Sequence, residues 1–359
     1  MSASETTTSF KWREFYRALF TANYTIESEN MIEEGTVDEV RQLVGESYML
    51  RAYVHFLLVN LYGEPYTHCD PATSKAIPLK LNSDTEAVLT RNTVGEVYSS
   101  ILSDLVEAEK YLNVDKWELG YNYRFTTLAV NALRSRVYLY MGDWAKSLEA
   151  SEAVLSVNNQ LVDMSSSTIL PNEYNSSENI LALEEVMNAQ YVRAAKVATS
   201  LWKLYGTGDL RKSKYFKQVT ASNIQVIKGG SNQYRCSFRV GEIYLNAAEA
   251  ALMTGEVAID VARENLLTLM EKRYTANAYA TKEAAVNAMG RDELLQEIYN
   301  ERTRELAFEG HRWFDLRRTT RPRLEKTFGG TSYVLEENDS RYTIRIPSEA
   351  IEANPGLAN

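Results

Sequence analysis

The feature that most constrains the fold of this 359-residue chain is a repeated pair of amphipathic segments joined by a short glycine turn. Apolar residues recur at the three-to-four spacing of a helix in two such pairs, 128–140 with 144–157 and 238–253 with 257–270. Each pair is joined at a glycine followed by an acidic residue, Gly142 and Gly255. Glycine there can adopt the left-handed conformation that ends a helix. Residues 126–157 and 239–270 are therefore predicted to be helix-turn-helix units of tetratricopeptide size.

The same spacing predicts most of the remaining secondary structure. Further helices are expected over 40–61, 94–112 and 293–308, with a shorter one around 313–318. The first of them should stop at Gly63, which is also followed by an acidic residue. Strand-like alternation is confined to short pieces such as 224–227 and 342–346. Helix therefore dominates the predicted fold.

The two repeat units are not in tandem, which sets the predicted domain organisation. Residues 158–235 lie between them, have weaker periodicity, and are interpreted as an inserted irregular lobe whose loops could shape a site. The chain is predicted to be a single, mostly α domain, with a scaffold of helix pairs over about 10–157 and 236–320 and a C-terminal tail over 321–359.

Charge and motif content exclude several classes of function. A net charge of -9 leaves no basic field for nucleic acid. Cys69 and Cys236 are far apart, and the three histidines lack the spacing of metal ligands, so no metal is expected. The common phosphate-loop, dinucleotide and nucleophile-elbow signatures are absent, so neither a cofactor nor an enzyme is expected. No apolar run is long enough to span a membrane, and no secretory signal opens the chain.

Several segments, in order along the chain, carry a family resemblance. The most specific are 12–16 (WREFY), 61–65 (LYGEP), 239–250 (RVGEIYLNAAEA) and 301–318 (ERTRELAFEGHRWFDLRR). Together they resemble the SusD/RagB family of outer-membrane nutrient-binding lipoproteins.

The resemblance implies a helical fold, an N-terminal lipid anchor at the cell's outer surface, and a position as a lid on a TonB-dependent transporter barrel. Family members usually carry a lipoprotein signal and an acylated cysteine, neither of which precedes Trp12 here. The resemblance also implies that the charged segment 301–318 is scaffold, because paired Arg and Glu side chains can lock a helix to its neighbours. The scaffold residues are Glu301, Arg302, Arg304, Glu305, Glu309, Gly310, Arg312, Asp315 and Arg317.

Two groups of residues have the composition of a glycan-binding surface, which needs flat rings and amide or charged groups for sugar hydroxyls. The first group, between two predicted helices, is Trp117, Tyr121, Asn122 and Tyr123. The second, in the lobe, is Tyr174, Asn175, Tyr191, Arg193, Trp202 and Tyr205, with Asn172 nearby. Two alternatives stay open: Tyr123 and Arg124 could pack at the start of the repeat, and Trp202 and Tyr205, at i and i+3, could form one buried helical face.

The leading hypothesis is non-catalytic capture of an oligosaccharide or other nutrient and its delivery to a transporter. A peptide- or protein-binding helical-repeat module is the alternative. A glycan-cleaving enzyme would need two carboxylates about 5 to 9.5 Å apart across a cleft.

Overall fold

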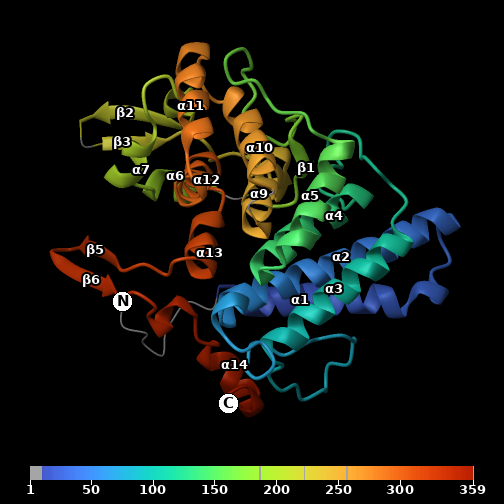
Figure 1. Cartoon of the computed structure of the whole chain (residues 1–359). Helices are drawn as coiled ribbons and strands as arrows, with labels where there is room; N and C mark the ends of the chain where they lie inside the picture. Colours follow the sequence, from blue (N-terminus) through green and yellow to red (C-terminus); the bar gives the residue numbers. More distant parts are fainter. Residues whose placement is uncertain (1–9, 186, 222, 256–257, 359) are drawn as a thin grey trace. The chain divides into compact units, whose positions relative to one another are not determined.

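A computed structural model describes residues 10–185, 187–221, 223–255 and 258–358. Fourteen α-helices and six short strands make up this described part (Figure 1). The chain forms two compact units: the first comprises 1–114, 140–142 and 313–359, and the second comprises 115–139 and 143–312. The mostly helical prediction is confirmed, and the predicted single domain with scaffold, lobe and tail stays a prediction.

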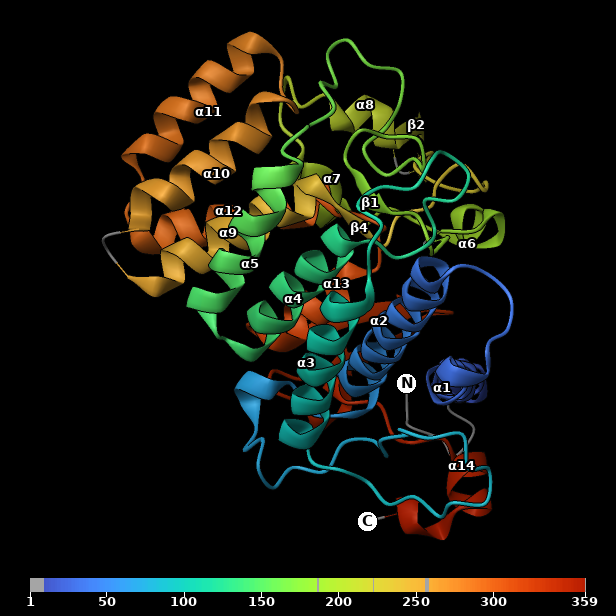
Figure 2. The same cartoon turned by 90° about the vertical axis from the view of Figure 1, so that its right-hand side faces the viewer.

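The first unit is built around a long helix that packs against two others. Helix α2 (Val37–Tyr62) contacts both α1 (Trp12–Glu27) and α3 (Val94–Tyr111), and Figure 2 shows it between them. Both α2 and α3 begin at a capping box, in which a threonine side chain and a glutamate three residues later satisfy each other's backbone N–H groups. These boxes fix where the two helices start.

The end of α2 differs from the expected glycine cap. Gly63 has φ -97° and ψ 159°, which is extended backbone rather than the left-handed conformation. A buried guanidinium takes over the role, since Arg317 donates to the Gly63 carbonyl at 2.6 Å and also to the Asn60 carbonyl. The expectation holds better at Gly142, whose φ is +73°, while Gly255 has a positive φ of 138° with extended ψ.

The first unit also contains the C-terminal part of the chain, from residue 313 onward. It holds most of α13 (His311–Arg318), the hairpin of β5 (Leu324–Phe328) and β6 (Thr331–Leu335), and α14 (Ser348–Ala353). The strand expected over 342–346 is wrong. Residues Ser340–Tyr342 form a 3-10 turn, and Ile344 donates its N–H to the Leu61 carbonyl at 3.1 Å, so the apolar alternation reflects a loop packed on the end of α2.

The second unit contains both predicted helix pairs. The first pair is α4 (Thr127–Met141, whose last two residues belong to the first unit) with α5 (Trp144–Val157), and the second is α9 (Val240–Thr254) with α10 (Ile259–Glu271). Helix α9 is central, because it packs against α5, α10 and α12 (Arg291–Glu305). Its alanines, Ala248 and Ala251 among them, are fully buried in a core with the leucines of α10. Small residues on α9 let three helices approach it.

The stretch between the two helix pairs consists of short elements. They are β1 (Asn179–Leu181), α6 (Ala189–Ala194), α7 (Thr199–Leu204), α8 (Arg211–Tyr215), β2 (Phe216–Thr220), β3 (Asn223–Val226) and β4 (Phe238–Arg239). Strand β1 pairs antiparallel with β4, and β2 with β3. The strand predicted at 224–227 is confirmed as β3. A helix absent from the sequence prediction, α11 (Ala276–Ala288), follows α10.

Candidate ligand pocket

Three loops of the second unit surround a pocket of about 740 Å³. We call it the Asn–Tyr pocket; its lining residues are Gly120, Asn122, Tyr123, Tyr174, Asn175, Ala182, Asn232, Gln233 and Arg235. One loop precedes α4, the second precedes β1, and the third precedes β4, while Ala182 directly follows β1. The pocket therefore draws on segments that are distant in the sequence.

Hydrogen bonds to the backbone hold these loops together. The side-chain amide of Asn122 donates to the Tyr174 carbonyl at 2.6 Å, and the Ala182 N–H donates to the Asn122 carbonyl at 2.9 Å. The Tyr174 N–H donates to the Gln233 carbonyl at 2.9 Å. Because each loop is tied to the next through main-chain atoms, Asn122 and Tyr123 of the first sequence group meet Tyr174 and Asn175 of the second.

The pocket combines exposed rings with amides. Tyr123 is 46% exposed, and its ring centroid lies 6.5 Å from that of the neighbouring, exposed Tyr121 at an interplanar angle of 33°. The Asn175 side chain is exposed at the rim. Flat rings can cover the apolar face of a sugar, and amides can bond its hydroxyl groups. The geometry suits a polar ligand with flat apolar faces.

Trp117 from the first group lies outside the lining of this pocket. Its indole N–H donates to the Phe125 carbonyl at 3.1 Å, and the Arg124 guanidinium lies 3.9 Å from the ring centroid. One face of the indole is thus already covered by a cation. This contact agrees with the alternative in which Arg124 packs at the start of the repeat.

The second sequence group is dispersed. Tyr191 and Arg193 are exposed on α6, whereas Trp202 borders a separate pocket of about 490 Å³, with the Lys212 ammonium 4.6 Å from its ring centroid. The prediction that Tyr205 contacts ligand is wrong in this structure. Its side chain is 1% exposed and its hydroxyl donates to the Arg304 carbonyl at 2.7 Å, so this ring belongs to the core.

Sequence reasoning missed the third loop of the pocket, which supplies Asn232, Gln233 and Arg235. The sequence signal that could have found this loop is the pair Gly229-Gly230 just before a polar run, since paired glycines are typical of loops. In the structure both glycines have positive φ. That signal locates a loop without showing which surface the loop faces.

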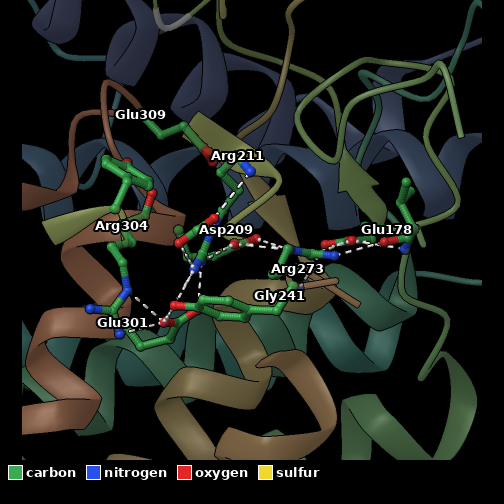
Figure 3. A network of polar contacts seen from close by, with 12 residues as sticks. Glu178, Asp209, Arg211, Gly241, Arg273, Glu301, Arg304 and Glu309 are labelled. Atoms are coloured by element: carbon green, nitrogen blue, oxygen red, sulfur yellow. Dashed lines mark hydrogen bonds and ion pairs between the residues drawn. The ribbon is translucent and has the colours of Figure 1, made fainter. Parts of the chain in front are cut away.

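Four charged residues at the start of the 301–318 segment lie in a buried network in the second unit (Figure 3): Glu301, Arg304, Glu305 and Glu309. Glu305 is its centre, and accepts from Arg211 at 3.0 Å, from Arg239 at 2.7 Å and from Arg273 at 2.9 Å. Glu301 pairs with Arg211 and Arg304 at 2.5 and 2.6 Å. These side chains come from α8, β4, the end of α10 and α12, so the network joins four elements.

The arginines keep the buried carboxylates ionised. Burial alone would raise the pKa of Glu301, but the guanidinium groups of Arg211 and Arg304 outweigh it and lower the pKa to about 2. At Glu309 burial would likewise raise the pKa, but the positive charges of Arg239 and Lys228 lower it to about 2. These carboxylates are therefore ionised near neutral pH. A general acid must instead carry a proton at that pH in order to donate it.

The other residues of the predicted scaffold segment also make local contacts. Arg302 donates to Asn246 at 2.7 Å, Arg312 to Thr303 at 2.9 Å, and Asp315 pairs with Arg318 at 2.9 Å, while Gly310 has φ +85°. Among the residues that the structure describes, no cluster of His, Cys, Asp or Glu could hold a metal ion. No described helix is both long and apolar enough to cross a membrane.

Paired helices carrying a loop-lined pocket define the class as a helical-repeat protein. The chain belongs to the SusD family, whose model matches residues 166–358. A second family model, described as starch-binding associating with outer membrane, matches residues 2–139. The family is one of carbohydrate-binding proteins rather than enzymes, and is associated with the outer membrane.

Two curated relatives come from Formosa agariphila. SusD-like protein P38 is 29% identical over 158 residues, which is 44% of this chain and 28% of the relative. SusD-like protein P2 is 30% identical over 150 residues, which is 42% of this chain and 27% of the relative. The matched regions thus span less than a third of either relative's length.

Solved structures share the fold across nearly the whole chain. A SusD superfamily protein from Bacteroides thetaiotaomicron superposes with a TM-score of 0.80 at 23% identity, over 96% of this chain and 84% of that one. A putative sugar binding protein from Bacteroides vulgatus gives a TM-score of 0.79 at 21% identity, over 98% and 84%. These likenesses confirm the fold.

Proposed function

We propose that this protein captures an oligosaccharide in the Asn–Tyr pocket at the outer surface of the cell, catalyses no reaction, and delivers the sugar to a TonB-dependent transporter. The observation that carries the proposal is the convergence of two ring- and amide-bearing segments, 120–123 and 174–175, on one pocket. Membership of the SusD family supports the same ligand class.

The polar groups of the pocket can bind a hydroxyl-rich ligand. The side-chain amide of Asn122 donates to the Tyr174 carbonyl, and its side-chain oxygen is an acceptor for a sugar hydroxyl. Arg235 adds a guanidinium to the lining. Each exposed stacking ring adds about 0.5 to 1.5 kcal/mol beyond area burial, so the affinity should be modest.

A glycan array followed by affinity gels tests the ligand class. Wild-type protein should be retarded by at least one polysaccharide, and Tyr123→Ala and Asn175→Ala should each reduce that retardation. Tyr191→Ala is the matched control, because this tyrosine is 61% exposed but lies on α6 outside the pocket lining. Absence of any glycan binding, together with selection of ligands from a peptide library, would replace the proposal with the peptide-binding alternative.

Delivery to a transporter requires a test in the cell of origin. A strain lacking this gene should take up the bound oligosaccharide more slowly, and wild-type protein should restore uptake. Restoration by Tyr191→Ala but not by Tyr123→Ala would tie uptake to the pocket. Uptake that is unchanged in the deletion strain would refute the delivery step and leave the binding step to the gel assay.

A further inference from the structure

The first unit has a pocket of its own, of about 710 Å³, which we call the α1 groove. Its lining comes from α1, from the loop 78–89 and from the C-terminal segment that includes α14: Trp12, Arg13, Tyr16, Arg17, Phe20, Thr21, Pro78, Lys80, Thr85, Ala87, Leu89, Glu349, Ala350, Ala353, Asn354 and Leu357. All of these residues belong to one compact unit. The groove is therefore a feature of that unit alone.

Hydrogen bonds between the three segments give the groove a fixed frame. Tyr16 donates its hydroxyl to the Pro78 carbonyl at 2.8 Å, and Asn23 donates to the Lys80 carbonyl at 3.0 Å. At the other side, Asn354 donates to the Leu89 carbonyl at 2.6 Å. These bonds also occupy the hydroxyl of Tyr16 and the amide N–H of Asn354, so they offer a ligand mainly their apolar atoms.

The charged groups of the groove are mostly cations without acidic partners. Lys80 is 8% exposed, and its ammonium donates to two neutral acceptors, the Asn82 side-chain oxygen at 3.2 Å and the Asp84 carbonyl. Within the described parts of the chain, neither Lys80 nor the two arginines of the lining, Arg13 and Arg17, is in an ion pair. A buried ammonium without a carboxylate is costly unless an anion compensates it.

The walls beside these cations are apolar and aromatic. Trp12, Phe20 and Leu357 contribute side chains from both sides of the groove, and the Phe20 ring stacks on that of Tyr24 with centroids 6.2 Å apart. Glu349 is the one carboxylate of the lining. The groove thus differs from the Asn–Tyr pocket, which offers amides and no buried ammonium.

We propose that the α1 groove is a second binding site, which takes an organic carboxylate with an apolar body. Lys80, Arg13 and Arg17 hold the carboxylate, and the aromatic and aliphatic walls cover the hydrocarbon part. Charge-assisted hydrogen bonds to a carboxylate are about twice as strong as neutral ones, so the anionic group should dominate selectivity.

Calorimetric titration with octanoate and with octanamide tests this site, since the two probes share a chain length and differ in charge. Octanoate should bind with one-to-one stoichiometry and octanamide at least about tenfold more weakly. Arg17→Gln, an exposed change on α1, should weaken octanoate binding about tenfold, which corresponds to 1.4 kcal/mol. Arg345→Gln is the matched control, because Arg345 is exposed in the same unit and outside the groove.

Lys80→Met gives a second test whose folding is checked by circular dichroism. A folded Lys80→Met protein should show a smaller preference for octanoate over octanamide than wild type, because one of the three cations is removed. The proposal would be overturned if the wild-type protein bound the two probes equally, if it showed no saturable octanoate binding, or if Arg17→Gln bound octanoate as tightly as wild type. Tyr123→Ala should leave octanoate binding unchanged, which separates this site from the oligosaccharide pocket.

Discussion

Replacement of Arg211 by methionine is the sharpest test of the buried network. Arg211 is fully buried and contacts three carboxylates, those of Asp209 at 2.8 Å, Glu301 at 2.5 Å and Glu305 at 3.0 Å. Arg211→Met removes all three contacts: it leaves the buried Asp209 without this cation, and Glu301 and Glu305 with one cation fewer. Breaking a buried pair in this way costs about 3 to 5 kcal/mol. For a unit of this size the midpoint of thermal unfolding should fall by roughly 6 to 20 °C.

Thermal and urea unfolding, followed by circular dichroism, measure this loss. Lys110→Met is the control, because Lys110 makes an exposed pair with Glu107 at 2.7 Å, and such pairs contribute about 0 to 1 kcal/mol. Arg211→Lys is a second comparison. It keeps the charge, but a single ammonium cannot reproduce a guanidinium that bonds several carboxylates at once, so an intermediate loss is expected.

The reasoning fails if Arg211→Met and Lys110→Met lose the same small amount. Such a result would mean that water or a rearranged neighbour compensates the three carboxylates. The network would then not be what holds α8 to α12.

Three further predictions concern pH and one tyrosine. The pKa values of Glu301 and Glu309, about 2, lie below the ordinary 4.5, so their stabilising contribution is complete above about pH 4.5 and is lost as the pH falls toward 2. Urea unfolding between pH 5 and 2 should show this loss of stability, and a stability that stays constant over that range would contradict the prediction. Burial, aided by the nearby charge of Arg51, lowers the pKa of His55 from 6.5 to about 3, so stability should already decline below pH 6.5, and His55→Asn should flatten that decline between pH 6.5 and 5. Tyr205→Phe removes one buried hydrogen bond and should cost about 1 kcal/mol in urea unfolding, while retardation on glycan gels stays at the wild-type value; a loss of retardation would return Tyr205 to the ligand surface.

The helices of the two repeat pairs could be predicted because one face of each is buried. Helices α4, α5, α9 and α10 each bury side chains at the helical spacing, and their predicted ranges agree with the structure to within about two residues at most ends. Helix α11 buries only Val286 along its length, so it has no apolar stripe for the sequence to reveal. Its helical form follows instead from alanine-rich composition.

The candidate pocket was only partly predictable, because rings and amides serve both ligands and cores. Tyr123 and Tyr205 are the same residue type in loop-rich sequence, yet one is 46% exposed and the other 1%. The difference arises because the Tyr205 ring packs against Phe216 and its hydroxyl reaches α12, a contact between residues 99 positions apart. Local composition cannot encode such a contact.

Contacts between distant residues also explain why the role of the charged segment 301–318 was predicted from a family resemblance and not from its own spacing. Glu301 and Glu305 lie one helical turn apart, a spacing that fits a surface ion-pair ladder or a scaffold equally well. The structure decides between the two, because Arg211 pairs with Glu301 and Arg273 pairs with Glu305. Both arginines come from segments outside α12, which the spacing within the helix cannot predict. Burial alone would raise the pKa of Glu301, but the charges of Arg211 and Arg304 lower it to about 2, and Glu305 joins α12 to Arg211 and Arg273.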